Sequence, residues 1–224
     1  MNQQGFFVTG TDTEVGKTRI SVALIEFLQT QGLAVAGMKP IASGCKQTGH
    51  GLRNDDALQL INQANVGFPY DRVNPYAFEP AIAPHIAADK IGTTIDLSVI
   101  SENFKQIKKQ ADAVVVEGAG GWLVPINYKQ TMADIAVEIN LPIIVVVAIK
   151  LGCINHALLT IKAIEMSGLT IQGWIANQTQ SNSHSDEIIY TLQQMIKAPC
   201  LGVIPHLKVN ESAKPYLKLS LTEP

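Results

Sequence analysis

The apolar residues of this chain fall into six short runs, separated by amphipathic segments and polar loops. Ile20, Leu24, Phe27 and Leu28 follow the first run at the spacing of one helix face. Strands that alternate with helices in this way indicate an α/β fold, with a mostly parallel sheet and helices on both faces. We expect strands near residues 6–9, 34–39, 113–117, 143–148, 171–176 and 200–204.

Further helices are expected at 98–109, 135–139, 158–166 and 188–196. The polar stretch 45–56 is predicted to be a loop, and prolines favour ordered loops and short turns between 66 and 84. We predict that His85 starts a helix. No internal repeat, low-complexity tract or linker interrupts the pattern, so a single domain over residues 1–224 is expected.

Composition narrows the classes of function. A net charge of −2 spread over 224 residues gives no basic footprint for nucleic acid. The longest apolar run, 141–149, is far shorter than the ~20 residues that a membrane-spanning helix requires, and no targeting segment is visible. Three widely spaced cysteines (Cys45, Cys153, Cys200) argue against a disulfide framework or a zinc site and favour a cytoplasmic location.

The first apolar run leads into a glycine-bracketed loop, Gly10 to Gly16, which ends in Gly-Lys-Thr at the start of the helix. This is the layout of a phosphate-binding P-loop, whose backbone N–H groups and helix dipole attract a polyphosphate. Lys17 can reach the β- and γ-phosphates, and the Thr18 hydroxyl suits Mg²⁺. Five residues rather than four separate the two glycines. A chance Gly-Lys-Thr is the alternative, which the flanking strand and helix disfavour.

Other polar residues lie at or near the ends of the predicted strands, where open α/β sheets bind ligands. Lys39 ends the second strand and Ser43 follows on the same rim, although a lysine at this position can also be simply solvated. In Asn54-Asp55-Asp56, one residue is expected to cap a helix, and Asp55 or Asp56 can bind metal.

Glu117 ends the third predicted strand and opens into the glycine-rich turn Gly118-Ala119-Gly120-Gly121. A carboxylate there is placed to bind Mg²⁺ or its waters, and an ordinary strand-end acid is the alternative. Asn177 ends the fifth strand. The helix that begins after Gly152 offers free N–H groups to an anion.

Together these residues resemble the dethiobiotin synthetase family. The matching motifs occur in order from about residue 5 to 207, and only the tail after Leu207 matches weakly. They are Gly10–Thr18, Lys39–Gly44, Gly51–Asp56, Val73–Tyr76, Pro84-His85, Val116–Trp122, Lys150–His156 and Gly173–Asn177.

The resemblance implies an ATP-dependent cyclo-ligase of biotin biosynthesis that requires Mg²⁺. Its substrates would be 7,8-diaminopelargonate and CO₂ or bicarbonate, and its products dethiobiotin, ADP and phosphate. One amine takes up CO₂ as a carbamate, ATP phosphorylates the carbamate, and the second amine closes the ring. A homodimer is implied, with no nucleic-acid or membrane partner.

The resemblance also implies a role for each matching residue. Thr18, Asp56 and Glu117 would hold Mg²⁺, and Asp56 is preferred to Asp55. Thr13, Lys39 and Ser43 would line the carbamate, and Glu14 and Lys17 would lie at the phosphates. The remaining nucleotide contacts would come from Val15, Gly16, Arg19, Gly118, Ala119, Gly120, Asn177, Gln178, Pro205, His206, Leu207 and Glu211. Across a dimer interface, the substrate carboxylate would meet Gly152, Cys153, Ile154 and Asn155.

Two other functions use the same fold. One is an amidotransferase-type or other ligase of the P-loop superfamily. The other is an ATPase switch that dimerises and positions other proteins. Loops of such switches carry a signature lysine before paired glycines, whereas this loop has Thr11-Asp12-Thr13-Glu14.

Overall fold

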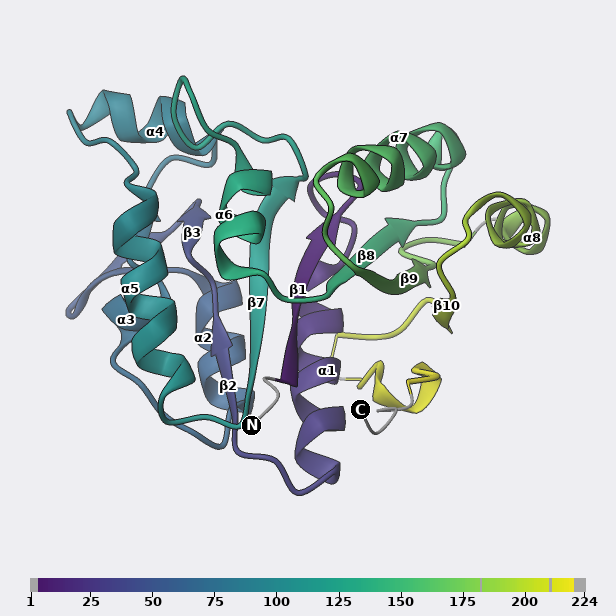
Figure 1. Ribbon diagram of the computed structural model, residues 1–224, viewed down its shortest axis with the longest axis horizontal. Coiled ribbons are helices and arrows are strands. Elements are labelled where there is room, and N and C mark those ends of the chain that lie inside the picture. Colours follow the sequence, from purple (N-terminus) through teal and green to yellow (C-terminus); the bar gives the residue numbers. More distant parts are fainter. Residues whose placement is uncertain (1–3, 182, 210, 220–224) are drawn as a thin grey trace.

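The computed structural model describes residues 4–181, 183–209 and 211–219. Its main sheet has six parallel strands in the order β10-β9-β8-β1-β7-β2, which Figure 1 shows from right to left. The strands are β1 (Gln4–Gly10), β2 (Val35–Met38), β7 (Ala113–Gly121), β8 (Ile143–Ala148), β9 (Ile171–Asn177) and β10 (Cys200–Ile204). The parallel sheet and all six predicted strands are confirmed.

Helices cover both faces of this sheet. Alternate residues of β8 point to opposite faces: Val145 packs in the cluster with α5, α6, α7 and α8, and Val146 in the cluster with α1. Strands that are buried on both sides read as continuous apolar runs, which is why the sequence revealed them. The helices on the two faces include α1 (Lys17–Thr30), α5 (Leu97–Lys108), α6 (Met132–Ile139), α7 (Cys153–Met166) and α8 (Ser185–Met195).

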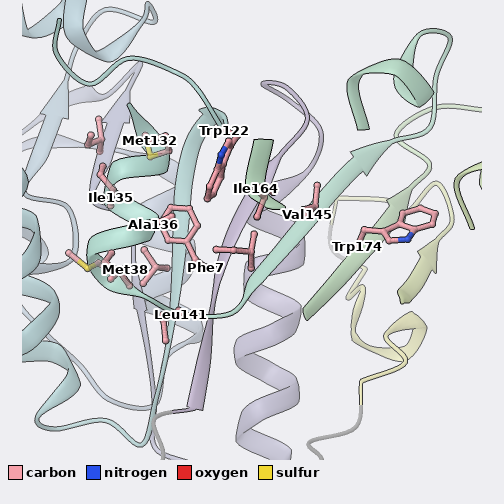
Figure 2. Close-up of a cluster of buried hydrophobic side chains, with 14 of the residues drawn as sticks. Phe7, Met38, Trp122, Met132, Ile135, Ala136, Leu141, Val145, Ile164 and Trp174 are labelled. Atoms are coloured by element: carbon pink, nitrogen blue, oxygen red, sulfur yellow. The ribbon is translucent and has the colours of Figure 1, made fainter. Parts of the chain in front are cut away.

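The larger cluster lies between the sheet and helices α5 to α8. Figure 2 shows Phe7 at its centre, with Trp122, Ile135 and Ala136 around it. The rings of Phe7 and Trp122 meet edge to face, with centroids 6.5 Å apart. This packing fixes β1 and β7, the two strands that lead into the P-loop and to Glu117.

The segment between β2 and α5 contains several further short elements. They are β3 (Ile41–Ser43), β4 (Lys46–Thr48), β5 (Gly51–Arg53), α2 (Asp55–Gln63), α3 (Tyr70–Val73), β6 (Tyr76–Phe78) and α4 (Pro84–Lys90). Of these, α2 packs along β2. Strands β3 and β6 pair in parallel, and β4 and β5 form an antiparallel hairpin. A short 3-10 helix, Lys214–Tyr216, follows β10 and packs near α1.

Several local predictions are wrong. We expected residues 41–44 to continue from Lys39 as a loop, but 41–43 form a strand. The predicted loop 45–56 contains the hairpin β4–β5, and 66–84 contains α3 and β6. The hairpin was missed because β4 is exposed along its length and shows no apolar alternation. Strand β7 does not stop at Glu117 but continues to Gly121, because Gly121 still pairs with Gly10 of β1.

Two predictions about helix starts can be settled. Asn54 caps α2, since its side-chain oxygen accepts from the backbone N–H groups of Asp56 and Ala57. Neither aspartate is therefore needed for capping. His85 lies in the first turn of α4, after Pro84, as expected.

Candidate active site

The loop between β1 and α1 has the backbone of a phosphate-binding loop. Glu14 and Gly16 adopt left-handed conformations, with φ of 58° and 92°. No side chain caps the start of α1 and no acidic residue lies in its first turn, so the amino end of the helix is open to an anion. A Cβ on Gly16 would lie 2.1 Å from Asn177 Nδ2, a contact that only glycine avoids.

The end of β9 is fastened to this loop. Asn177 Nδ2 donates to the carbonyl of Val15 at 2.8 Å, and the Asn177 side chain is buried. The backbone N–H of the next residue, Gln178, donates to the carbonyl of Ile204 at 2.9 Å. The segment after β10 is held in turn by Arg19, whose guanidinium donates to the carbonyl of Leu207 at 3.1 Å. Residues of α1, β9 and the 205–207 segment thus form one rim beside the P-loop.

Lys17 is 7% exposed and its Nζ donates to the carbonyl of Asp12 at 2.9 Å. Burial, together with the nearby Lys39 ammonium, lowers the pKa of Lys17 to about 8. The lysine therefore lies under the loop with a charge that a phosphate group would stabilise.

Lys39, directly after β2, is 4% exposed and forms the centre of a charged cluster. Its Nζ lies 2.7 Å from Glu117 Oε1 and 3.3 Å from Asp56 Oδ2. Thr18 Oγ1 donates to the same Glu117 oxygen at 2.9 Å. The Glu117 carboxylate of β7 therefore joins two segments that are far apart in sequence: the start of α1 and the residue after β2.

The charge state of Lys39 follows from two opposing effects. Burial alone would lower the pKa of Lys39, but the carboxylates of Glu117 and Asp56, with their hydrogen bonds, outweigh it and raise the pKa above its ordinary value. Lys39 is thus a fixed cation in the interior of the site.

A cavity of about 670 Å³ opens above this cluster. Its polar lining comes from the P-loop, Lys39, Ser43, Asp56 and Glu117, and its apolar wall from residues 81–84 and Val124. Two residues of this lining, Ser43 and Glu117, each have a buried oxygen, Oγ and Oε2, with no hydrogen-bond partner in the described part of the chain. Buried oxygens without partners are costly, which points to a polar ligand in this cavity.

The predicted residues divide into those that line this cavity and those that do not. Thr13, Glu14, Gly16, Lys17, Thr18, Lys39, Ser43, Asp56, Glu117, Ala119 and Gly120 line it. Gly118 lies in β7, and its carbonyl accepts from Lys39 Nζ at 3.4 Å. Glu211 is exposed and accepts from the backbone N–H of Lys208 at 2.9 Å. Gly152, Cys153, Ile154 and Asn155, at the start of α7, are not part of the lining.

Donors for a divalent cation are present. The described residues hold no group of three or more His, Cys, Asp and Glu side chains arranged to bind a metal. Magnesium does not need one, because it keeps several waters and binds through one or two carboxylates and substrate phosphates. The carboxylate of Asp56, the unpartnered Oε2 of Glu117 and the Thr18 hydroxyl fit that chemistry.

The apolar wall was not predicted, nor was a role in the site for three polar residues behind the cluster: Tyr70, Asn74 and Asn54, which was expected only as a possible helix cap. The two asparagines are buried, and all three hydrogen-bond to one another or to the site. An Asn-Pro pair at 74–75, followed by a strand, was the available signal.

Comparisons with known proteins agree with this geometry. A family model described as an AAA domain matches residues 4–214. An ATP-dependent dethiobiotin synthetase BioD of Pseudomonas aeruginosa is 46% identical over 205 residues, which cover 91% of this chain and 90% of that protein. The chain belongs to the dethiobiotin synthetase family. The BioD protein of Cellvibrio japonicus, another dethiobiotin synthetase, is 44% identical over 223 residues, covering 99% and 98% of the two chains.

A solved structure, the MinC:MinD cell division protein complex of Aquifex aeolicus, superposes with a TM-score of 0.59 at 20% identity. The match covers 91% of this chain and 82% of that chain. Identity this low shows a common fold and no more, whereas the two dethiobiotin synthetases are 46% and 44% identical to this chain. The resemblance drawn from the motifs is confirmed.

No helix in the described residues is both long and apolar enough to cross a membrane.

Proposed function

We propose that this chain catalyses the ATP-dependent closure of a cyclic urea, converting 7,8-diaminopelargonate and CO₂ to dethiobiotin, ADP and phosphate. Membership of the dethiobiotin synthetase family supports the reaction. The observation that carries the assignment to this cavity is the buried Lys39 ammonium, which faces the same space as the P-loop.

In the first step one substrate amine attacks CO₂ and loses a proton, giving a carbamate. Lys39, Ser43 and Thr13 would bind the carbamate oxygens, since a fixed cation and two hydroxyls suit a small anion. The free Ser43 Oγ is available for this hydrogen bond.

In the second step a carbamate oxygen attacks the γ-phosphorus of ATP, and the bond to the ADP oxygen breaks. Phosphoryl transfer depends on alignment and charge neutralisation. Lys17 and the backbone N–H groups of Val15 to Arg19 would hold the phosphates, with Glu14 beside them. Bound by Thr18, Asp56 and Glu117, Mg²⁺ would supply positive charge to the phosphate oxygens.

In the last step the second amine attacks the carbonyl carbon of the mixed anhydride, the C–O bond to phosphate breaks, and the departing phosphate takes up the proton that the amine loses as the ring closes. The apolar wall formed by residues 81–84 and Val124 would pack against the alkyl chain and exclude water that would hydrolyse the anhydride.

Nucleotide selection is assigned to the rim beside the P-loop. The Asn177 amide would read adenine, with Gln178 and the segment Pro205-His206-Leu207 alongside. Gly118, Ala119 and Gly120 would border the phosphates, and the last two line the cavity. Glu211 is assigned to the ribose.

The substrate carboxylate is assigned to the start of α7 in a second copy of the chain. Gly152 adopts a left-handed conformation and no side chain caps the helix. The Cys153 N–H donates to the carbonyl of Lys150 at 3.1 Å, so the N–H groups of Ile154 and Asn155 would meet the anion. Because Gly152 to Asn155 are not part of the cavity lining, a homodimer would be needed to complete the site. The three cysteines are free, which is consistent with the proposed location in a reducing cytoplasm. We also propose that residues 1–224 form a single domain.

The test is ADP release with Mg²⁺-ATP and bicarbonate, measured with and without 7,8-diaminopelargonate. Release that depends on the diamine, matched by dethiobiotin in mass spectrometry, would support the proposal. ATP hydrolysis that is indifferent to the diamine would overturn it and favour an ATPase switch.

A further inference from the structure

The motif Val73-Asn74-Pro75-Tyr76 has no role in the reaction as described above. In the structure Asn74 is 2% exposed, and its Nδ2 donates to the backbone carbonyl of Lys39 at 2.7 Å. The backbone N–H of Lys39 donates to the carbonyl of Val73 at 3.0 Å. Both backbone polar groups of Lys39 are therefore fixed by two consecutive residues of this motif.

A second buried amide holds the other side of the charged cluster. Asn54 is 7% exposed, and its Oδ1 accepts from the backbone N–H of Asp56 at 3.1 Å. The Asn54 Nδ2 donates to the carbonyl of Ser43 at 3.5 Å. Asn54 thus fixes the first turn of α2, which presents Asp56, and touches the segment that presents Ser43.

One hydroxyl connects these two amides. Tyr70 Oη accepts from the backbone N–H of Asn54 at 2.7 Å and donates to Asn74 Oδ1 at 2.8 Å. The Arg53 guanidinium lies over the Tyr70 ring, 4.0 Å from its centroid, and fixes the ring in place. A continuous path therefore runs from the backbone of Lys39, through Asn74, Tyr70 and Asn54, to the backbone of Asp56.

We propose that Tyr70 is a positioning residue that sets the separation of Lys39 and Asp56, an inference that rests on the proposed function. Lys39 follows β2 and Asp56 is the second residue of α2. The body of α2 packs on β2, and at the end of β2 the two residues are also linked through the path described above. Their side chains meet with Nζ 3.3 Å from Oδ2. The Tyr70 hydroxyl joins the two supporting amides, Asn54 and Asn74, so its removal leaves each amide to hold its own side of the cluster without the other.

The variant Tyr70→Phe removes this hydroxyl and keeps the ring under Arg53. Tyr76→Phe is a matched control, because the Tyr76 hydroxyl likewise accepts a backbone N–H, that of Asp96 at 2.9 Å, but lies outside the path. Three readouts separate positioning from folding: melting temperature, kcat against KM for ATP, and the Mg²⁺ concentration for half-maximal binding of a non-hydrolysable ATP analogue.

For Tyr70→Phe we expect kcat to fall roughly tenfold while KM for ATP changes less than about twofold, because alignment is lost and the P-loop is untouched. The Mg²⁺ concentration for half-maximal binding of the analogue should rise at least roughly threefold. When Asp56→Ala is already present, adding Tyr70→Phe should not raise this concentration further. Tyr76→Phe should lose a similar amount of melting temperature and show neither effect.

Equal kcat and equal Mg²⁺ dependence in the two tyrosine variants would overturn the proposal, as would a Tyr70→Phe shift that persists without Asp56. Failure of the proposed function is seen separately, as wild-type ADP release that ignores the diamine. In that case the Mg²⁺ dependence of analogue binding still decides the role of Tyr70.

Discussion

The two oxygens of the Glu117 carboxylate have different surroundings. Oε1 accepts hydrogen bonds from Thr18 and Lys39, whereas Oε2 is buried without a partner among the described residues. A buried carboxylate oxygen that accepts no hydrogen bond is strongly unfavourable unless a cation reaches it. Glu117 is therefore arranged so that its second oxygen can serve a ligand while the first holds the protein together.

Asp55 and Asp56 allow a matched test of the assigned cation site. Asp56 lies against Lys39 inside the cavity, whereas Asp55 pairs with the exposed Lys46 at 2.6 Å. Asp56→Ala should raise the Mg²⁺ concentration for half-maximal activity roughly tenfold, the effect expected for loss of one charged ligand. Asp55→Ala should change it less than about twofold, because an exposed ion pair contributes little. Titrating Mg²⁺ at fixed ATP measures both, and equal responses would contradict the choice of Asp56.

Lys17 predicts a pH dependence of nucleotide binding. Its pKa in the free protein is about 8, lowered mainly by burial, so the neutral form predominates above that pH. A triphosphate favours the charged form, and binding above pH 8 must therefore take up a proton. The affinity for ATP should be flat below about pH 7 and fall by up to roughly tenfold per pH unit above pH 8.

The control for this prediction is Lys17→Arg, which stays protonated over the same range. Lys39 does not contribute to this pH dependence, because Glu117 and Asp56 raise its pKa and it stays protonated. Calorimetry at several pH values measures the slope. A wild-type affinity that stays constant past pH 8, or an equal slope in Lys17→Arg, would remove Lys17 as the titrating group.

At the scale of elements, the P-loop depends on a strand that follows it by more than a hundred residues. Asn177, at the end of β9, donates to Val15 and leaves no room for a side chain at Gly16. The loop is thus held from two sides, by its own helix and by the rim that is assigned to the adenine. A change in the distance between β9 and α1 should therefore alter the conformation of the phosphate-binding loop.

Comparing Gly16→Ala with Gly32→Ala separates the effect of backbone strain from the effect of a steric clash with Asn177. Both glycines have left-handed backbones, with φ of 92° and 80°, so each alanine should cost about 1–2 kcal/mol of folding free energy. A Cβ on Gly32 meets nothing within 4 Å, but one on Gly16 meets Asn177 at 2.1 Å. Gly16→Ala alone should also weaken ATP binding, by roughly a hundredfold, since the loop and Asn177 must move apart. Melting curves and ATP titrations measure the two effects, and similar ATP affinities in both variants would refute the collision.

The same elements show what the sequence could predict. Continuous apolar runs such as 143–148 can only be buried strands or helices, and their length and valine content favoured strands. The loop from Gly10 to Gly16 and the acid Glu117 near the end of a predicted strand were enough to predict where the site lies. The continuation of β7 past Glu117 was not predictable, because it depends on Gly121 finding Gly10 on another strand. Nor was the sharing of one Glu117 oxygen by Lys39 and Thr18, since side-chain contacts across 78 and 99 residues leave no local pattern.

At the scale of the whole molecule, the proposed site is divided between two copies of the chain. The P-loop, Lys39 and Asp56 line one cavity, and the start of α7 lies outside it. Leu151 beside this start is 99% exposed, and Leu159 on α7 is 62% exposed. Apolar side chains in such positions are suited to an interface with a second subunit.

Mixed dimers test this division directly. Lys39→Gln should abolish turnover, because it removes the buried cation. Asn155→Asp should raise KM for the diamine at least roughly tenfold, since a carboxylate at the start of α7 repels the substrate carboxylate. In a hybrid dimer, the Lys39 of the Asn155→Asp chain would work with the Asn155 of the Lys39→Gln chain, and one intact site would form.

If the two variants are unfolded together, mixed in equal amounts and refolded, half of the dimers are hybrids with one intact site each. At a diamine concentration that saturates only the wild type, activity should recover to about one quarter of the wild-type value. Each variant refolded alone is the control. Sedimentation should first show that the refolded mixture is dimeric. If its activity is then no greater than the sum of the two controls, α7 acts on its own subunit. A monomer that is fully active at assay concentrations would exclude a shared site altogether, because no second α7 could then reach the cavity.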